Sequence, residues 1–460
     1  MNTGPISMAI FFGFFFLSAY SLQRAFLVFL LLSPFLPGYI AFPLGSDGSG
    51  ISAFRLASYS IFLVFVASLI SDPNSWVGVW RCWMREKAIV AAFIILTVSR
   101  AVSTIVYQEP RMMFYVLDEF ILIFSLLLLS TRVFINNKSI LELRTVYSVS
   151  SVLLLAFLMI EVLGQRPVLS YFLNVTVTIV GEGVFEGFAR DGRYRAQSFF
   201  DNPLSFAEFL LYTSVMFLFL FRKTNARNGW AYAVVGVVML VATFSTGARF
   251  AFVVVVIIFL SYIIFRFLKT ASATAQKVLI LSLLMAILVA VFSLSAILAD
   301  IENYIDLFSF LIVDDVSSLP SLISRANQWT AIPAEVTSNQ FIGILGEGYR
   351  SDLIERIDIR LDSYYFRLLI EGGWLAVAAF LLVYAKAMLS CAIFSKSRAR
   401  ILSKLSVSDA AFFLRIFFSI FFVTKLFLSM NFNNYLLFVF LGLLVSLHSR
   451  TKANAHSPHP

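Results

Sequence analysis

Three arginines that could bind a diphosphate lie close together in this apolar chain. Arg190, Arg193 and Arg195 fall within six residues, and Asn202 and Pro203 follow just before an apolar run. The planar guanidinium group suits bidentate binding of phosphate. A helix that starts at Pro203 would add free N–H groups, which favour an anion. The alternative is a solvated loop whose arginines reach lipid phosphates.

Two acidic residues are candidates for proton handling. Glu208 lies little more than one turn inside an apolar run, where a carboxylate is costly and is either functional or paired with an arginine. Asp362 directly precedes a later apolar run. It could act as a base or accept a hydrogen bond from a sugar hydroxyl, and a helix N-cap is the equally plausible alternative.

Two further segments carry candidate ligand-binding residues. Arg249 ends the sequence Ser-Thr-Gly-Ala-Arg between two apolar runs, so it must point into a cavity, pair with an acid or fix a helix end. Arg325 opens a polar segment in which Gly346 permits a tight turn, either against a ligand or as a turn alone. Tyr364 could stack on a sugar ring or belong to an interfacial aromatic belt.

The composition is that of a membrane protein. The 460 residues are 60% hydrophobic and 13% charged, whereas soluble domains carry about 25% charged residues. The net charge of +9 comes mostly from basic loops that are expected to be cytoplasmic. Such loops also attract anionic lipid headgroups, so no nucleic-acid partner is expected. Two cysteines, both beside basic loops, predict neither a structural disulfide nor a thiol metal site.

Apolar runs of membrane-spanning length recur along the whole chain and predict an all-α polytopic membrane protein. We expect about 13 spans, or about 12 if the first two form a re-entrant pair. The N-terminal run lacks the basic region of a secretory signal and is read as a retained helix. The runs lie near 5–22, 25–44, 52–71, 88–107, 114–131, 145–163, 203–221, 230–246, 250–267, 278–299, 366–388, 408–430 and 432–449.

The basic residues orient these spans. Nine of the ten lysines fall in short loops that are expected to be cytoplasmic, and the tenth, Lys425, lies inside an apolar run. This places two long loops on the outer face, and the larger is expected to be partly helical, for example from 352 to 361. The expected organisation is N-terminal transmembrane helices (1–163), an outer loop with the arginine cluster (164–202), central helices (203–299), a large outer loop (300–365), C-terminal helices (366–449) and a cytoplasmic tail (450–460).

Histidine is absent from every expected outer segment. The three histidines are His448, His456 and His459, all near the C-terminus. We therefore expect no histidine base and no histidine-ligated metal on the outer face. Nucleotide-binding and hydrolase motifs are also missing, so no cofactor is expected. The energy for any outer-face synthesis would enter with the substrate, and a lipid-linked diphosphate sugar is the natural donor.

Together these segments resemble the O-antigen polymerase and ligase family of bacterial envelope glycosyltransferases. The likeness covers the whole architecture and is most specific at 193–205 (RYRAQSFFDNPLS), at 245–249 (STGAR) and at 324–375, which ends in a Glu-Gly-Gly turn. The resemblance implies a metal-independent enzyme of the bacterial inner membrane. Its expected partners are a polyprenyl-diphosphate-linked oligosaccharide, the lipid bilayer, a chain-length regulator and a flippase.

The resemblance leaves three functions open and favours a polymerase of lipid-linked repeat units. Family ligases, which transfer a finished chain to lipid A core, typically have a histidine where this chain has Asp362. A flippase or transporter is a further alternative, although such proteins usually show internal repeats and midplane polarity. The expected diphosphate-binding residues are Arg190, Arg193, Arg195, Arg249 and Arg325.

Overall fold

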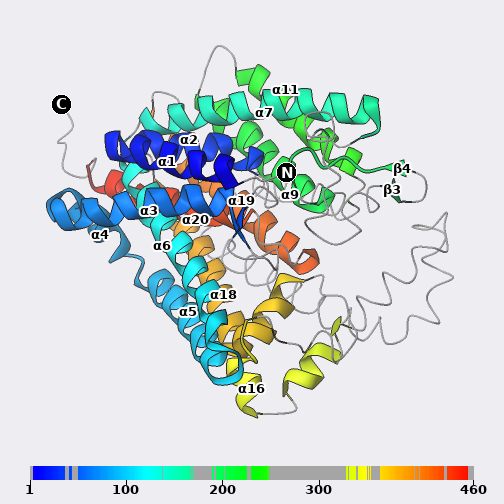
Figure 1. Ribbon diagram of the computed structural model, residues 1–460. Helices are drawn as coiled ribbons and strands as arrows, with labels where there is room; N and C mark the ends of the chain where they lie inside the picture. The colour runs from blue at the N-terminus through cyan, green and yellow to red at the C-terminus, as the bar shows by residue number, and fades with distance from the viewer. Residues whose placement is uncertain are drawn as a thin grey trace.

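Apolar helices make up most of the chain that the structure describes (Figure 1). The structure is a computed structural model. It describes residues 4–36, 41–43, 50–136, 138–166, 168, 189–190, 193–200, 202–224, 229–246, 248, 328–329, 331–337, 340–349, 351, 353, 363–397, 399–402, 405–428 and 433–453.

Among these residues, eight helices are long and apolar enough to cross a membrane, and three shorter apolar helices accompany them. The expected all-α polytopic membrane fold is therefore confirmed. The long helices are α3 (Ala53–Ser71), α5 (Lys87–Tyr107), α6 (Met113–Ile135), α7 (Lys138–Gly164), α9 (Pro203–Val215) continued by η5 (Met216–Phe221) and α10 (Arg222–Thr224), α11 (Gly229–Ala242) continued by η6 (Thr243–Thr246), α18 (Tyr364–Phe394) and α19 (Val407–Phe427). The shorter helices are α1 (Gly4–Tyr20), α2 (Leu22–Leu32) with η1 (Ser33–Phe35), and α20 (Asn434–Ala453).

Short elements connect these helices. Two antiparallel hairpins, β1 (Ala41–Pro43) with β2 (Gly50–Ser52) and β3 (Ala189–Arg190) with β4 (Arg193–Tyr194), are the strands of the described chain. The remaining connections are η2 (Pro73–Trp76), α4 (Val77–Trp83), η3 (Pro110–Met112) and α16 (Gln340–Leu345).

Each described apolar helix overlaps an apolar run of the sequence, but the expectation of one span at 25–44 is wrong. Helix α2 and η1 end at Phe35, after Pro34, and residues 41–43 form β1. The expected spans at 250–267 and 278–299 lie outside the described residues, so the total of about 13 stays a prediction. Helix α16 and the helical residues 331–337 agree with a partly helical large loop. The amphipathic helix expected at 352–361 falls almost entirely outside the described chain.

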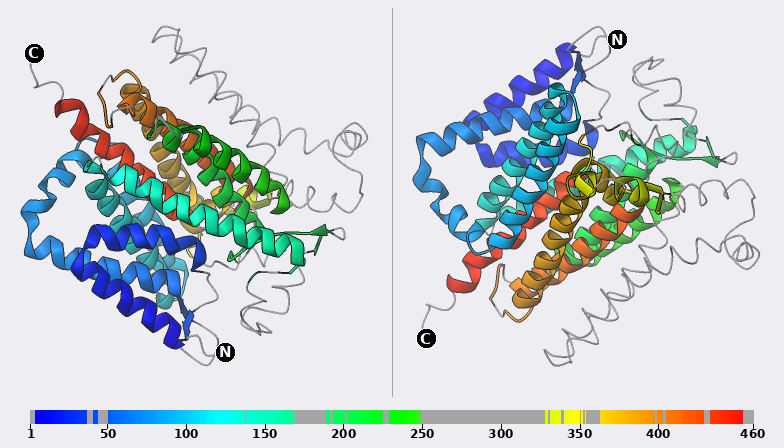
Figure 2. Two further views of the ribbon diagram at one scale, coloured as in Figure 1. Left: turned by 90° about the horizontal axis from the view of Figure 1, so that it is seen from above. Right: turned by 90° about the horizontal axis from the view of Figure 1, so that it is seen from below.

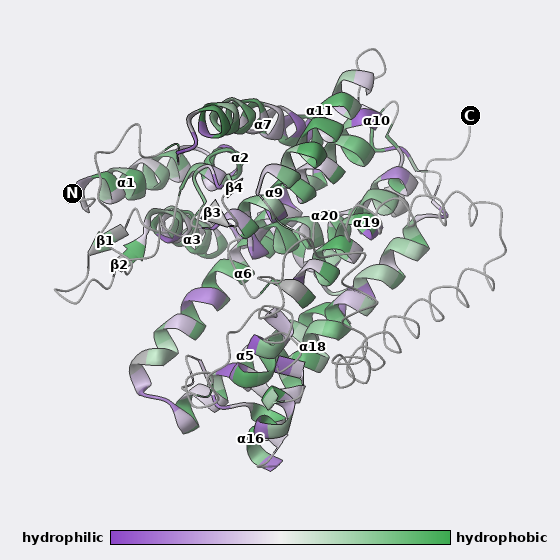
Figure 3. Ribbon diagram, turned by 90° about the vertical axis from the view of Figure 1, so that its right-hand side faces the viewer, coloured by the Kyte–Doolittle hydropathy of each residue, from purple (hydrophilic) through white to green (hydrophobic). Residues whose placement is uncertain are grey.

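Helix α20 lies inside the bundle, packed against α4, α6, α18 and α19 (Figure 2). Every residue from 433 to 447 is buried, as is typical of a helix that is apolar on all sides and surrounded by other helices. In contrast, α11 exposes Val234, Val237, Val238 and Val241. Most of the helices are coloured as hydrophobic in Figure 3. Exposed apolar faces such as that of α11 suit contact with lipid.

Local sequence sets two features that matter for the site. Helix α9 begins as expected, with Asn202 as N-cap, its Oδ1 accepting a hydrogen bond from the N–H of Leu204 at 2.8 Å, and Pro203 in the first turn. Helix α18 is broken at Gly373, whose φ of 66° and ψ of −168° are not helical. This break lies in the Glu-Gly-Gly sequence, where the resemblance implies a turn, and it interrupts the span expected as one run at 366–388.

Candidate functional site

Polar contacts at the two ends of the bundle agree with the expected alternation of helix direction. Glu86, just before α5, accepts a hydrogen bond from Ser390 Oγ at 2.7 Å, and His448 Nε2 lies 2.8 Å from the same oxygen. Lys386 Nζ is 3.5 Å from the other carboxylate oxygen. The start of α5 and the ends of α18 and α20 thus meet at one end, here named the expected inner end. The opposite one is the expected outer end.

The Glu86 carboxylate is buried in this cluster. Burial alone would raise its pKa, but the hydrogen bonds from His448 and Ser390 and the charge of Lys386 outweigh burial and lower the pKa below its ordinary value of 4.5. The cluster therefore favours an ionised glutamate that ties three helices together.

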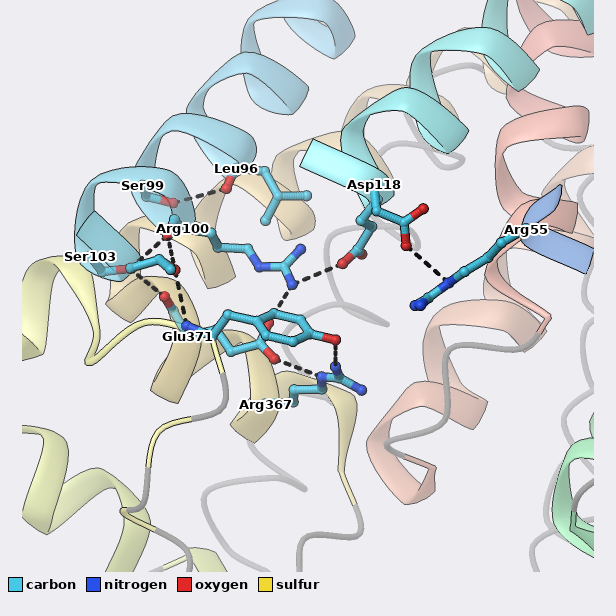
Figure 4. A network of polar contacts seen from close by, with 11 residues as sticks. Arg55, Leu96, Ser99, Arg100, Ser103, Asp118, Arg367 and Glu371 are labelled. Atoms are coloured by element: carbon cyan, nitrogen blue, oxygen red, sulfur yellow. Dashed lines mark hydrogen bonds and ion pairs between the residues drawn. The ribbon is translucent and has the colours of Figure 1, made fainter. Parts of the chain in front are cut away.

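Arg100 is the centre of a buried ionic network at the expected outer end (Figure 4). Its Nη2 atom lies 2.9 Å from Glu119 Oε2 of α6 and also forms an ion pair with Glu371 of α18. Arg367 Nε is 2.8 Å from the other oxygen of Glu371. Two arginines thus face two glutamates. This pairing compensates charges that would otherwise be costly inside an apolar bundle.

A second ion pair continues this network toward α3. Arg55 Nε lies 2.9 Å from Asp118 Oδ2, and the Tyr59 hydroxyl donates a hydrogen bond to the other oxygen of Asp118. Because Asp118 and Glu119 are neighbours on α6, the starts of α3 and α6 are linked to the network around Arg100.

The segment from Gly346 to Tyr349 is fixed against α5 and α18. The N–H of Tyr349 donates to Thr104 Oγ1 at 3.0 Å, and Gln108 Nε2 donates to the carbonyl of Glu347 at 2.8 Å. The N–H of Glu347 donates to the carbonyl of Ile370 at 2.7 Å. The large loop therefore returns to the bundle on a defined path.

The aromatic ring of Tyr349 lies beside the ionic network. The guanidinium carbons of Arg100 and Arg367 are 5.8 Å and 5.5 Å from its ring centroid, and the Tyr115 ring stacks on it at 5.2 Å. Burial raises the pKa of the Tyr349 phenol above its ordinary value although Arg367 acts in the opposite direction. The phenol therefore stays neutral and accepts a hydrogen bond from Arg367 at 3.3 Å.

Gly346 makes the expected close backbone approach, but it packs against the backbone of α18 and not against a ligand. Its φ is +77°, and a Cβ added there would lie 2.5 Å from the carbonyl oxygen of Ile370. Gly373, at the break in α18, packs against the backbone of residue Ile344 in the same way. The structure thus favours the alternative in which Gly346 forms a turn alone and does not approach a ligand.

The arginine segment contacts the Ser-Thr-Gly-Ala-Arg segment. Arg195 is half-buried, and its Nε donates to the carbonyl of Thr246 at 2.9 Å. The N–H of Ala196 donates to the carbonyl of Ser245 at 3.1 Å. Upstream, Arg190 and Arg193 are paired residues of the β3–β4 hairpin. The segment around Arg195 and the segment at 245–246 therefore meet in space.

Glu161 of α7 binds the turn that directly follows Arg195. Its two carboxylate oxygens accept hydrogen bonds from the N–H groups of Gln197 at 2.9 Å and Ser198 at 2.7 Å. Ser198 has a φ of 54°, a left-handed conformation that is uncommon for serine. Charge-assisted bonds to two successive N–H groups hold this turn in place, and so they fix the position of Arg195.

Glu208 has a buried partner, and that partner is a lysine rather than the expected arginine. Lys425 Nζ of α19 lies 2.7 Å from Glu208 Oε1, and both side chains are 0% exposed. The Tyr212 hydroxyl and Asn433 Nδ2 donate to the carboxylate at 2.7 Å and 3.0 Å. This favours the paired role over direct proton transfer with a substrate, because the carboxylate is enclosed by protein.

Tyr364 is also enclosed. It begins α18 with 4% exposure, and its ring lies 5.3 Å from the Phe380 ring and 5.8 Å from Lys425 Nζ. A tyrosine packed in this way offers no open face to a sugar, so the stacking role expected for Tyr364 does not fit its position in the structure.

The remaining candidate residues fall on parts of the chain that the structure does not describe. Asp362, Arg249 and Arg325 lie outside the described residues, as do the side chains of Arg190 and Arg193. Sequence reasoning missed Arg100, Glu119, Arg367, Glu371 and Glu161, which all sit within or beside apolar runs. Their signal was available, because an ionisable residue inside a span marks a functional or paired site.

In the part of the chain that the structure describes, no group of three or more His, Cys, Asp or Glu side chains could hold a metal ion. Comparison with known families finds no family model that matches the chain, and no curated protein matches it.

Proposed function

We propose that the chain is a polymerase of polyprenyl-diphosphate-linked oligosaccharide repeat units, acting on the outer face of a bacterial inner membrane to build surface polysaccharide. In the reaction, a hydroxyl of the incoming repeat unit forms a bond to the reducing-end carbon of the growing glycan. The bond from that carbon to the diphosphate breaks, and the hydroxyl proton passes to a base. The released polyprenyl diphosphate leaves with the electron pair.

The observation that carries this proposal is the anchoring of Arg195. One guanidinium is tied to Thr246 at the end of η6, and the residues that follow it are bound by Glu161 of α7 just before α9 begins. Three helix ends thus hold an arginine segment at the edge of the bundle. Preorganised guanidinium groups stabilise the charge that develops on a leaving diphosphate. The expected outer end of the bundle is also where the headgroup of a lipid-linked donor would lie.

The remaining roles are assigned by chemistry. Arg190, Arg193, Arg249 and Arg325 are proposed to join Arg195 on the diphosphate. Asp362 is the proposed proton acceptor, since the Glu208 carboxylate is already occupied by Lys425. The network around Arg100 holds the end of the large loop and does not contact substrate in this proposal.

Arginine substitution tests the proposal in the host. Arg195→Ala and Arg325→Ala should each abolish chains longer than one repeat and leave single-unit products. Arg195→Lys should retain part of the chain length, because it keeps the charge and loses the bidentate geometry. Arg222→Ala is the matched control, since Arg222 is exposed at the expected inner end and should leave chain lengths unchanged. Wild-type chain lengths in both alanine variants would refute the assignment.

Deletion of the gene distinguishes a polymerase from a ligase, and activity in detergent tests for a transporter. A strain without a polymerase shows single repeats on the acceptor or none, whereas a strain without a ligase accumulates long chains on the carrier lipid. Activity of the purified protein in detergent, where no two compartments exist, would exclude transport as the primary function.

A further inference from the structure

The ion pair between Glu208 and Lys425 is too deeply enclosed to touch a substrate. Both side chains are 0% exposed, and their atoms are 2.7 Å apart. A lysine and a glutamate at this depth are costly unless each has a partner. The pair belongs to a polar cluster between α9 and α19, in which the Tyr212 hydroxyl also lies 2.6 Å from Thr424 Oγ1. This cluster joins the two helices by specific contacts, which two apolar residues in place of the pair would not form.

On the α19 side, one helical turn holds the start of α18. The Ser363 hydroxyl donates to the carbonyl of Lys425 at 3.4 Å, and Lys425 Nζ lies 5.8 Å from the Tyr364 ring centroid. The Tyr365 hydroxyl donates to the carbonyl of Phe422 at 3.1 Å. The N-cap Ser363 and the first two residues of α18 thus contact residues 422–425, and these three residues directly follow Asp362 in the sequence.

On the α9 side, Asn433 links the same pair to the start of the helix that follows the arginine segment. Asn433 Nδ2 donates both to Glu208 Oε2 at 3.0 Å and to the carbonyl of Ser205 at 2.8 Å. Ser205 lies in the first turn of α9, whose N-cap Asn202 follows the segment that contains Arg195. The first two turns of α9 are therefore joined to the ends of α19 and α20.

We infer that Glu208 and Lys425 are positioning residues, which set the start of α18 relative to the start of α9. This inference rests on the proposed function: it makes the pair responsible for the register between the diphosphate-binding arginines and the proposed base. Neither residue touches the reacting atoms. Misplacement of a reacting group by about 1 Å can lower a rate on the order of 10²-fold, so a small shift of α18 would suffice to lower turnover.

Kinetics of the purified protein test the catalytic consequence. Glu208→Gln and Lys425→Met should lower kcat on the order of 10²-fold, with KM for the lipid-linked repeat unit within about twofold, because the arginines remain in place. Lys425→Arg, and the reversed pair Glu208→Lys with Lys425→Glu, should restore part of kcat because they keep an ion pair. Native kcat in both single variants would overturn the inference.

Thiol labelling tests the placement without relying on activity. Ser363 is 2% exposed, so a Ser363→Cys variant in detergent should react slowly with a maleimide and at least several-fold faster when Lys425→Met is added. The native Cys391 is buried near the other end of α18 and serves as the control for general unfolding. Faster labelling at position 363 with Cys391 still protected is the expected result.

Two outcomes have separate meanings. Equal gains in labelling at position 363 and at Cys391 would show loss of the whole fold and overturn a positioning role. No gain at position 363 would overturn it as well. If the wild-type protein forms no polymer, the proposed function fails, whereas the labelling still reports whether the pair holds the start of α18.

Discussion

Replacing Arg100 with methionine would leave two carboxylates without their shared partner. Arg100 is 4% exposed and binds Glu119 of α6 and Glu371 of α18. Glu371 would keep Arg367, whose Nε lies 2.8 Å away. Glu119, whose side chain is 19% exposed, would lose its ion pair with Arg100. The substitution therefore tests whether the network holds α5, α6 and α18 together at the expected outer end.

The magnitude follows from burial. Removing one partner of a buried ion pair costs about 3–5 kcal/mol. Since Glu371 keeps a second arginine, we expect Arg100→Met to cost about 3 kcal/mol, at the lower end of that range. Arg55 is the matched comparison, because its side chain is 38% exposed and its pair with Asp118 is screened by solvent. Arg55→Met should therefore cost no more than about 1 kcal/mol.

Thermal unfolding of the purified variants in detergent would compare their losses of stability. The apparent melting temperature should fall clearly for Arg100→Met, less for Arg367→Met and least for Arg55→Met. Limited proteolysis should also cut near Tyr349 sooner in Arg100→Met, because the segment from Gly346 to Tyr349 is docked on α5 and α18 beside the network. Equal melting temperatures for the Arg100 and Arg55 variants would refute the reasoning.

Three further predictions concern single contacts. Gly346→Ala should reduce the yield of folded protein, since its Cβ would lie 2.5 Å from the carbonyl oxygen of Ile370 and its φ is +77°; a normal yield and melting temperature would contradict this. Glu161→Gln should shorten the polysaccharide without reducing protein yield, because one carboxylate oxygen that binds the turn after Arg195 becomes an NH₂ group; chain lengths on a gel report it, and unchanged lengths would argue against the anchoring role. The pKa of Glu86 is lowered from 4.5, so its ionised form stabilises the fold above that pH and the stabilisation is lost as pH falls further. Wild type should therefore exceed Glu86→Gln in melting temperature at pH 7 and converge with it in acid, and a constant difference across pH would contradict the assigned cause.

Hydropathy and local signals predicted the helices well. Each described apolar helix overlaps an apolar run, because a span must satisfy its backbone internally and needs a minimum apolar length. The start of α9 at Pro203 followed from Asn202 as N-cap. This feature depends on residues within one turn of one another, so a single sequence is enough.

Pairing between distant helices could not be predicted in the same way. Glu208 and Lys425 were both visible as charges inside apolar runs, yet nothing in the sequence shows that α9 and α19 are neighbours. Arg100 and Glu371 are likewise joined only by the packing of α5 on α18. The expectation of an arginine partner for Glu208 was wrong because helix neighbours, and not residue type, decide which charge is available.

Reconstitution of the purified protein with its proposed substrate tests the central claim most directly. The protein in lipid nanodiscs would receive polyprenyl-diphosphate-linked repeat units, isolated from a host strain that lacks it, and no nucleotide. We expect a ladder of products that differ by one repeat unit, together with release of polyprenyl diphosphate, and neither with Arg195→Ala. Repeat units that remain single with the wild-type protein, while it keeps its native melting temperature, would contradict the proposed polymerase function.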